Sequence, residues 1–319
     1  MASDGKELRG KLVTVLGGGG FFGKHLAQEL LSRGARLRIA SRHPERAFRS
    51  KTSGNLGDVQ FVRCDVTKPA SVAAAVAGAD AVVNLVGAFA GDLDAVQGRG
   101  AGQIAAAAKA AGASAFVHVS AIGADAESKV EYARTKAEGE AAVLAAFPKA
   151  TVLRPSILFG PDDNFVNMFG RLIATLPALP VFAPTAKLQP LFVDDAAEAV
   201  AHAIAEPSKH GGKTYEIAGP EVLTMLELNQ RIAAAEGRSR WLMELPDVVG
   251  GLIATFGFLP GAPITSDQFA LLKAGNVAGG ALPGLKALGV SPRPLGLYLD
   301  RWLVQYRKHG RFGAKASAG

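Results

Sequence analysis

A chain of 319 residues, of which 49% are hydrophobic and 20% charged, is long enough to bury a sizeable core as one large domain or two modest ones. Its single cysteine, Cys64, excludes an internal disulfide, and its six scattered histidines show no zinc-ligand spacing, so we expect a reducing compartment and no metal site. The net charge of +7 is moderate and comes with no basic-aromatic sheet motif or helix-turn-helix pattern, which argues against a nucleic-acid partner.

Short aliphatic or β-branched runs alternate with segments of helical spacing through the first half of the chain. The runs are apolar throughout, which is typical of strands buried on both faces. The expected strands cover residues 12–16, 37–40, 59–62, 81–85, 115–120 and 150–153. The expected helices between them cover residues 22–33, 70–77, 94–111 and 128–147. This alternation predicts an α/β fold of the Rossmann type, with a doubly wound parallel sheet covered by helices on both faces.

The regular alternation ends at Arg154-Pro155-Ser156, and a proline-rich stretch follows at 177–190. Later elements are expected as a strand at 188–193, a helix at 195–205, a strand at 213–217 and a helix after Thr224. The last helix begins with a capping box formed by Thr224 and Glu227. We therefore expect a nucleotide-binding domain at 1–154 and a smaller α/β region at 155–319 that faces a substrate or partner, with the alternative that its elements add to the first sheet.

Four consecutive glycines lie between the first expected strand and the first expected helix, in LVTVLGGGGFFGKHLAQELLSRG. Gly17, Gly20 and Gly23 fit G-x-x-G-x-x-G, and Gly18 begins the alternative G-x-G-x-x-G. Glycine suits these positions because the chain must turn sharply, approach a pyrophosphate and pack the helix against the strand. The N-terminus of the helix then offers N–H groups and a partial positive charge to the phosphates. The segment therefore predicts a dinucleotide site.

The end of the second expected strand indicates which dinucleotide is bound. An NAD site usually has an acidic residue there, about 20 residues beyond the glycines, to bind the ribose 2′-hydroxyl. This chain has Ser41 and Arg42 instead, with Arg46 one turn on and no acid until Glu45, so NADP(H) is preferred and NAD(H) is the alternative. Asp65, after the third strand, is placed to meet the adenine amino group, although an N-cap role for the next helix also fits.

Tyr132 and Lys136 follow the fifth expected strand and lie four residues apart. On a helix they share a face, so the ammonium of Lys136 is expected near the phenol of Tyr132, where it would lower the phenol pKa. A phenol tuned in this way can act as acid and base in hydride transfer at a carbinol carbon.

The order of these motifs, with Ser120 at the end of the fifth strand, resembles the short-chain dehydrogenase/reductase superfamily. LRPSILFGPDDNFVNMF, QPLFVDDAAEAVAHAI and KTYEIAGPEVLT are similar to its extended and atypical branch. ITSDQFALL and LPGLKALGVSPRPL look most like the nucleotide-binding accessory subunit of respiratory complex I and its bacterial relatives. This resemblance, over residues 12 to about 303, implies tightly held NADP(H), a largely structural or regulatory role and peripheral association with a membrane arm. In the superfamily the lysine also binds the nicotinamide ribose hydroxyls, a role that the resemblance assigns to Lys136.

The motifs and the resemblance together give a set of expected site residues. Tyr132, Lys136 and Ser120 are the expected catalytic residues, if the protein is an enzyme. The expected nucleotide contacts are Gly17, Gly18, Gly20, Phe21, Phe22, Gly23, Ser41, Arg42, Asp65, Val66, Asn84, Val86, Gly87, Ser120, Tyr132, Lys136, Pro155, Ser156 and Ile157.

One departure from the superfamily pattern leaves two functions open. Active members carry a serine or threonine hydroxyl one or two positions beyond Ser120, where this chain has Ala121 and Ile122. A site without that hydroxyl would orient a carbonyl substrate poorly. The first function is an NADP(H)-binding accessory or assembly protein linked to respiratory complex I or ubiquinone metabolism. The second is an active NADP-dependent reductase, dehydrogenase or epimerase that acts on a lipid-like or quinone-related small molecule.

Two segments bear on partners and location. Residues 245–264 contain the longest apolar run, too short to span a bilayer but compatible with a buried helix, which we favour, or an interfacial one. The tail at 301–315 mixes basic residues with aromatic ones, as at a membrane surface or an acidic partner, although a solvated helix explains it equally well. The polar start shows no signal or transit peptide pattern, so we expect a cytoplasmic protein, with peripheral association at the inner face of the membrane as an open alternative.

Overall fold

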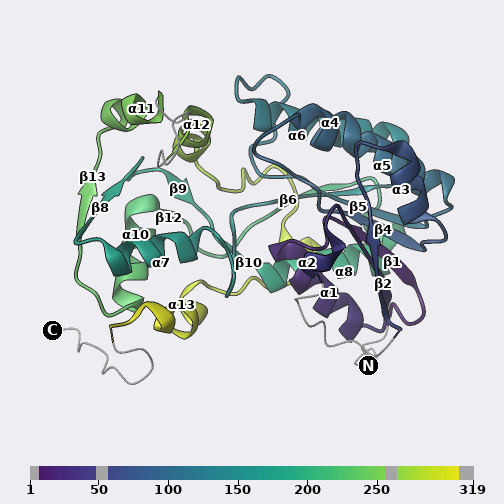
Figure 1. The fold of residues 1–319 in the computed structure, drawn as a ribbon, viewed down its shortest axis with the longest axis horizontal. Coiled ribbons are helices and arrows are strands. Elements are labelled where there is room, and N and C mark those ends of the chain that lie inside the picture. The colour runs from purple at the N-terminus through teal and green to yellow at the C-terminus, as the bar shows by residue number, and fades with distance from the viewer. Residues whose placement is uncertain (1–6, 48–56, 256–263, 309–319) are drawn as a thin grey trace. The chain divides into compact units, whose positions relative to one another are not determined.

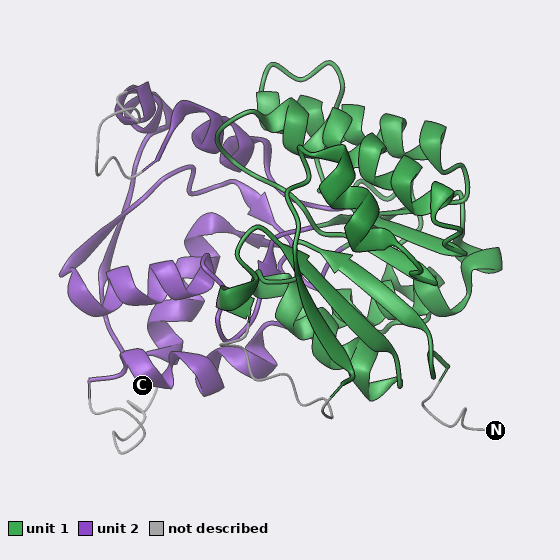
Figure 2. Ribbon diagram, turned by 45° about the vertical axis from the view of Figure 1, so that its right-hand side comes forward, with its two compact units in different colours: residues 1–155, 193–217, 279–291 green, residues 156–192, 218–278, 292–319 purple. Residues whose placement is uncertain are grey.

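The computed structural model describes residues 7–47, 57–255 and 264–308. The chain forms two compact units, coloured separately in Figure 2. Unit 1 consists of Met1–Pro155, Val193–Ile217 and Gly279–Ser291, and unit 2 of Ser156–Phe192, Ala218–Ala278 and Pro292–Gly319. The expected division into domains at 1–154 and 155–319 stays a prediction, because a compact unit need not be a domain that folds by itself.

A seven-stranded sheet forms the centre of unit 1 (Figure 1). Its strand order is β11-β6-β5-β4-β1-β2-β3, and every neighbouring pair is parallel. The strands are β1 (Leu12–Leu16), β2 (Arg36–Ser41), β3 (Val59–Arg63), β4 (Ala81–Asn84), β5 (Ala115–Val119), β6 (Thr151–Pro155) and β11 (Thr214–Ile217). The predicted Rossmann-type parallel sheet is thus confirmed, and β11, from the second half of the chain, extends it beyond β6.

Helices cover both faces of this sheet. The longer ones are α1 (Phe21–Ser32), α3 (Pro69–Val76), α5 (Arg99–Ala110), α6 (Glu131–Ala146) and α8 (Val193–Ala205), and the shorter ones are α2 (Pro44–Ala47), α4 (Leu93–Gln97), α9 (Pro207–His210) and the 3₁₀ helix η1 (Leu285–Leu288). On one face, Leu16, Val82 and Phe116 of the sheet pack against side chains from α3, α5 and α6. Helices α1 and α8 pack against each other, and Figure 1 shows them on the opposite face.

Small residues let the helices beside β4 and β5 approach one another closely. A Cβ on Gly139 of α6 would lie 2.0 Å from the carbonyl oxygen of Gln97 in α4, and one on Gly102 of α5 would lie 2.8 Å from the Cβ of Ala142 in α6. This tight packing gives the segment that carries Tyr132 and Lys136 a rigid support.

The expectation of one helix over 94–111 is wrong, because the chain forms α4 and α5 with a break at Gly98. The side chain of Asp92 caps α4 by accepting a hydrogen bond from the backbone N–H of Ala95 at 2.9 Å. Asp94 accepts the backbone N–H of Arg99 at 3.0 Å and pairs with the guanidinium of Arg99. Local side-chain acceptors at the break therefore compete with a continuous helix.

Unit 2 contains three small sheets and several helices. The strands pair as β10 (Leu191–Phe192) with β7 (Leu158–Phe159), β12 (Leu223–Thr224) with β9 (Lys187–Leu188), and β13 (Trp241–Glu244) with β8 (Ala178–Val181). The helices are α7 (Val166–Thr175), α10 (Met225–Ala235), α11 (Asp247–Thr255), α12 (Ser266–Ala274), α13 (Gly296–Trp302) and the 3₁₀ helix η2 (Leu303–Tyr306). The expected strand at 188–193 is divided between β9 and β10, since Pro190 has no N–H to donate to a continuous ladder. The predicted capping box of Thr224 and Glu227 at α10 is confirmed.

The two segments considered for partner contacts differ in exposure. Val248 and Leu252 of α11 are 84% and 63% exposed, so the buried-helix interpretation that we favoured is wrong for this face. In the tail, the ring of Trp302 stacks on that of Tyr298 at 5.2 Å, and the Tyr306 hydroxyl donates to Oδ1 of Asn167 at 3.2 Å. Residues 256–263 and 309–315 of these segments lie outside the described residues. Among the helices that the structure describes, none has both the length and the apolar composition to cross a bilayer.

Candidate nucleotide site and Tyr132–Lys136 pair

The glycine turn joins β1 to α1 and lies against the carboxyl ends of the neighbouring strands. Gly17 has φ +76°, and its N–H donates to the carbonyl of Ala40 in β2 at 2.9 Å. A Cβ on Gly17 would lie 3.2 Å from the backbone of Leu85 and Val86, just after β4. Both the left-handed conformation and the close neighbour favour glycine here.

The start of α1 is a helix terminus without a capping side chain. A Cβ on Gly23 would lie 2.4 Å from the carbonyl oxygen of Gly18, so the turn and the helix touch through backbone alone. No side chain caps the N-terminus at Gly20, and the first turn has no acidic residue. The first N–H groups of a helix, here those of Phe21, Phe22 and Gly23, have no acceptor within the helix. The terminus thus suits a pyrophosphate in both shape and charge.

The end of β2 places the hydroxyl of Ser41 beside this turn. The Oγ of Ser41 is buried and has no hydrogen-bond partner among the residues that the structure describes, and it lies 3.6 Å from where a Cβ on Gly19 would be. Arg42 follows it with an exposed side chain. A hydroxyl without a partner and an exposed arginine at the next position of the chain suit a ribose phosphate, and their contact with a nucleotide remains a prediction.

Asp65 follows β3 and is not the N-cap of α3. Its Oδ1 accepts the backbone N–H of Thr67 at 3.1 Å and the hydroxyl of Thr67 at 2.7 Å, and these hydrogen bonds hold the carboxyl pKa below its usual value. The N-cap of α3 is Lys68, so the alternative that gave Asp65 this role is wrong. The predicted contact of Asp65 with an adenine, next to the buried Val66, is not tested by this geometry.

Asn84 shapes the loop after β4. It is fully buried, its Oδ1 accepts the N–H of Val86 at 3.0 Å, and its amide lies 3.1 Å from Nδ1 of His118 on β5. Burial, and then the charge of Lys136, lower the pKa of His118 to about 3, so the ring is neutral. Sequence patterns missed His118 because a histidine inside an apolar strand looks like any other buried residue.

Lys136 lies in the interior, between α6 and the ends of β4 and β5. Its side chain is 4% exposed, and its Nζ donates to the carbonyl of Val119 at 3.3 Å. The same Nζ lies 3.2 Å from where a Cβ on Gly87 would be, so two expected nucleotide contacts are brought together. Burial lowers the pKa of Lys136 to about 8, and the charge of Glu140 opposes that shift.

The expectation that Lys136 lowers the pKa of Tyr132 is wrong for this geometry. The ammonium lies 6.0 Å from the centroid of the Tyr132 ring and is hydrogen-bonded to Val119. Burial raises the pKa of the Tyr132 phenol to about 12. Desolvation of the phenolate therefore outweighs the attraction to the lysine.

An aromatic side chain covers one face of the Tyr132 ring. Phe89, on the loop after β4, stacks on the Tyr132 ring with centroids 4.6 Å apart. The Oγ of Ser120 is buried without a hydrogen-bond partner among the described residues, and the next two residues, Ala121 and Ile122, carry no hydroxyl. The hydroxyl expected one or two positions beyond Ser120 is therefore missing from this chain.

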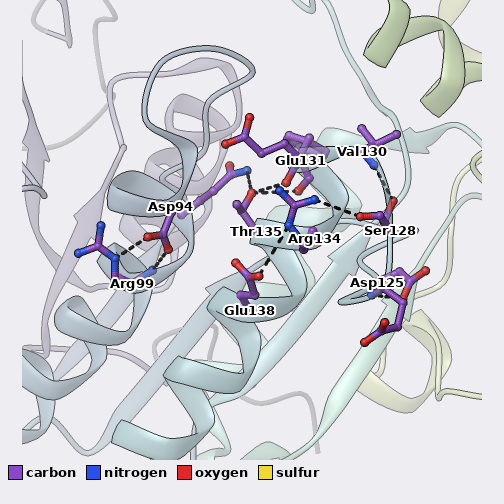
Figure 3. A network of polar contacts seen from close by, with 12 residues as sticks. Asp94, Arg99, Asp125, Ser128, Val130, Glu131, Arg134, Thr135 and Glu138 are labelled. Atoms are coloured by element: carbon purple, nitrogen blue, oxygen red, sulfur yellow. Dashed lines mark hydrogen bonds and ion pairs between the residues drawn. The ribbon is translucent and has the colours of Figure 1, made fainter.

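A polar network fixes the N-terminal turn of α6, as Figure 3 shows. Arg134 donates to the carbonyl of Ser128 at 3.2 Å, and the Ser128 hydroxyl accepts the N–H of Val130 at 3.2 Å. Gln97, which is fully buried, donates to the hydroxyl of Thr135 at 2.9 Å and accepts the N–H of Ala88 at 3.2 Å. Sequence analysis missed Gln97 because its partners, Ala88 and Thr135, lie on separate elements.

The expected contacts at the end of β6 lie in different units. Pro155 belongs to unit 1, where its carbonyl accepts the N–H of Ile122 at 3.0 Å. Ser156 and Ile157 belong to unit 2, where the Ser156 hydroxyl donates to the carbonyl of Gln189 and the N–H of Ile157 donates to Oδ1 of Asn276, both at 2.6 Å. Their contact with a nucleotide stays a prediction. Within the described residues, no group of three or more histidine, cysteine, aspartate or glutamate side chains is placed to hold a metal ion.

Comparisons with known proteins agree with this architecture. A mitochondrial protein of Rattus norvegicus, NADH dehydrogenase [ubiquinone] 1 alpha subcomplex subunit 9, is 32% identical over 95% of this chain and 82% of its own length. A ceramide reductase of Caulobacter vibrioides is 29% identical over 82% of each chain. The solved structure of an NADPH-dependent quinone oxidoreductase of Escherichia coli, complexed with NADPH, matches the fold with a TM-score of 0.72 and 19% identity, over 90% of this chain and 98% of that one.

A family model described as the NAD dependent epimerase/dehydratase family matches residues 13–218. The match runs from β1 through β11 and so includes the whole parallel sheet, the glycine turn and the Tyr132–Lys136 pair. The chain belongs to the NAD dependent epimerase/dehydratase family, the extended branch of the short-chain dehydrogenases/reductases.

Proposed function

We propose that this protein is an NADP(H)-binding accessory or assembly protein linked to respiratory complex I or to ubiquinone metabolism. The similarity to the rat complex I subunit over 95% of the chain carries the proposal, because it includes unit 2 as well as the nucleotide-binding fold. The state of Tyr132 supports it further. A phenol whose pKa is raised to about 12, under a stacked phenyl ring, is a poor acid-base catalyst at neutral pH.

In this role the site holds a nucleotide and does not turn it over. The N-terminus of α1 would bind the pyrophosphate, and Ser41 with Arg42 would bind the 2′-phosphate. Lys136, held by Val119, would bind the ribose hydroxyls next to the nicotinamide. The exposed Val248 and Leu252 of α11 would serve as contacts to a partner or to the inner membrane surface, where the protein would sit on the cytoplasmic side.

The test is to isolate the native protein and identify by mass spectrometry both the nucleotide it releases and the proteins that copurify. We expect NADP(H) in near-stoichiometric amount, together with subunits of a respiratory NADH dehydrogenase. Nucleotide fluorescence should persist unchanged when candidate carbonyl compounds are added. A preparation with no affinity for NADPH or NADH would refute the proposal.

A second candidate function is an active NADP-dependent reductase, dehydrogenase or epimerase. It is favoured by the position of Tyr132 and Lys136 on one face of α6 and by the similarity to a ceramide reductase. Bound NADPH would supply the hydride. The Tyr132 hydroxyl would give its proton to the carbonyl oxygen, and protonated Lys136 would stabilise the phenolate left behind.

The second function has its own test. Oxidation of NADPH by an added carbonyl compound should be abolished in Tyr132→Phe while the nucleotide stays bound. Turnover lost in this way would overturn the purely accessory role. Turnover that survives in Tyr132→Phe would exclude Tyr132 as the proton donor.

A further inference from the structure

An exposed aromatic ring covers one face of the candidate proton donor. Phe89 is 70% exposed, and its ring lies nearly parallel to that of Tyr132, with an interplanar angle of 10° and centroids 4.6 Å apart. A phenyl ring left in water to this extent contributes little to a core. Its position next to the Tyr132 phenol therefore calls for an explanation other than packing.

The loop that carries Phe89 is held in place by a buried side chain. The Oε1 of Gln97 accepts the N–H of Ala88, the residue before Phe89, while its Nε2 donates to the hydroxyl of Thr135. That hydroxyl donates in turn to the carbonyl of Glu131, the residue before Tyr132. One buried amide thus supports both sides of the aromatic pair, which favours a fixed geometry over a chance contact of a mobile loop.

The chemistry around the pair favours one class of ligand. A carbonyl oxygen that reaches the Tyr132 hydroxyl brings its molecule against the Phe89 ring, since the two rings are in direct contact. Phe89 offers no hydrogen bond, Ala121 and Ile122 carry no hydroxyl, and Ser120 is left as the hydroxyl at this strand end. A flat apolar molecule gains stacking and buries the exposed ring, whereas a polyhydroxylated one loses the hydration of the hydroxyls that meet the Phe89 ring.

We propose that Phe89 contacts the substrate and selects flat, apolar aromatic carbonyl compounds over sugars. This inference rests on the second candidate function. In the reduction, the carbonyl carbon would take the hydride that bound NADPH supplies, and the oxygen would take the proton of Tyr132. The C=O π bond would be lost, a ketone would give a secondary alcohol and NADP⁺, and Tyr132 would take a proton back from the solvent.

The experiment measures binding at equilibrium, so that no turnover is needed. Isothermal titration calorimetry gives the Kd of 2-acetonaphthone and of its saturated counterpart, 2-acetyldecalin, for the NADP⁺-saturated protein and for the nucleotide-free protein. Stacking of the size usual for aromatic pairs predicts that the wild type prefers the flat ketone by about three- to tenfold. The preference should vanish in Phe89→Leu and persist in Phe89→Trp. Trp241→Leu is the matched control, because Trp241 is 72% exposed on β13 in unit 2 and should leave the preference unchanged.

Three results would overturn the inference: no measurable binding of 2-acetonaphthone, an unchanged preference in Phe89→Leu, or tighter binding of UDP-glucose than of 2-acetonaphthone. Failure of the proposed functions is observed separately. Nucleotide binding is read by mass spectrometry and turnover by NADPH oxidation, and neither enters the ratio of the two ketone affinities. A protein that binds no nucleotide still reports the preference in its nucleotide-free form.

Discussion

Replacing Gly23 by alanine should damage the fold and the nucleotide site together. The new Cβ would lie 2.4 Å from the Gly18 carbonyl oxygen and 2.5 Å from two more Gly18 backbone atoms, whereas ordinary Cβ contacts begin at 3.4 Å. Because all three atoms are backbone, no side chain can swing aside, and α1 must move by about 1 Å relative to the turn. That movement disturbs the packing of Leu26 and Leu30, which are fully buried side chains of α1 itself.

The expected loss in the free energy of unfolding is about 3 kcal/mol, the upper end of the usual cost of overpacking. The shifted N–H groups should also lower the affinity for NADPH about 100-fold, which corresponds to the loss of one or two charge-assisted hydrogen bonds. Urea unfolding followed by circular dichroism measures the first quantity, and titration of NADPH fluorescence measures the second.

Gly20→Ala separates the two effects and serves as the control. Its Cβ would lie 3.5 Å from the Gly17 carbonyl oxygen, an ordinary contact, and its φ of −83° suits any residue. The free energy of unfolding should therefore stay within about 0.5 kcal/mol of the wild-type value, while the affinity for NADPH should fall about tenfold or more because the methyl group occupies the space of the pyrophosphate. The reasoning is refuted if Gly20→Ala keeps full affinity, or if Gly23→Ala matches the wild type in both measurements.

Three further predictions concern single side chains. Arg42→Ala should raise the Kd for NADPH about tenfold and leave that for NADH unchanged, as calorimetry can measure; equal losses for both would contradict a 2′-phosphate contact. Glu140→Ala removes the carboxylate to which Arg154 donates hydrogen bonds of 2.7–3.2 Å. The free energy of unfolding, measured by urea titration, should fall by about 3 kcal/mol, and a loss below about 1 kcal/mol would show that the ion pair is dispensable. Burial raises the pKa of Glu236 from 4.5 to about 8 despite Arg238 at 3.6 Å, so between these pH values the carboxyl keeps its proton in the folded state and loses it in the unfolded state. The free energy of unfolding should therefore fall as the pH rises from 4.5 to about 8. Glu236→Gln should flatten this pH dependence in urea unfolding, and an unchanged pH dependence would assign it to other groups.

The parallel sheet could be predicted because its signal is local. Each strand is an apolar run bounded by a turn. A helix between two such runs carries the chain back along the sheet, so the next strand runs parallel to the one before it. The position of β11 could not be predicted in the same way. It pairs with β6 in the register Tyr215 to Leu153, and the long chain segment between them contains the whole first part of unit 2, Ser156–Phe192. Nothing within the five-residue strand pattern specifies such a distant partner.

The nucleotide turn was predictable for a related reason. Its requirements are those of a few neighbouring residues, and the structure places the Gly23 and Gly18 backbones in direct contact. The residues that sequence patterns missed come from separate elements. Gln97 has meaning only through the N–H of Ala88 and the hydroxyl of Thr135, and Phe89 only through the ring of Tyr132. A single residue carries no trace of such partners in its own neighbourhood.

The pKa of Tyr132 shows most clearly where helical spacing stops being informative. A separation of four residues places Lys136 on the same face of α6, but the sign of the phenol pKa shift depends on the competition between Coulomb attraction and desolvation. Here the ammonium is directed to the carbonyl of Val119, and burial decides the outcome, raising the phenol pKa to about 12.

Any ligand that draws the Lys136 ammonium toward the Tyr132 hydroxyl would shift this competition the other way. Binding of the nucleotide should therefore lower the pKa of Tyr132, and a spectrophotometric titration of the phenol near 295 nm, with and without NADP⁺ and with Tyr132→Phe as the blank, would detect the shift. If the titration of Tyr132 is identical in the two states, the nucleotide does not reposition the lysine, and the accessory role gains support.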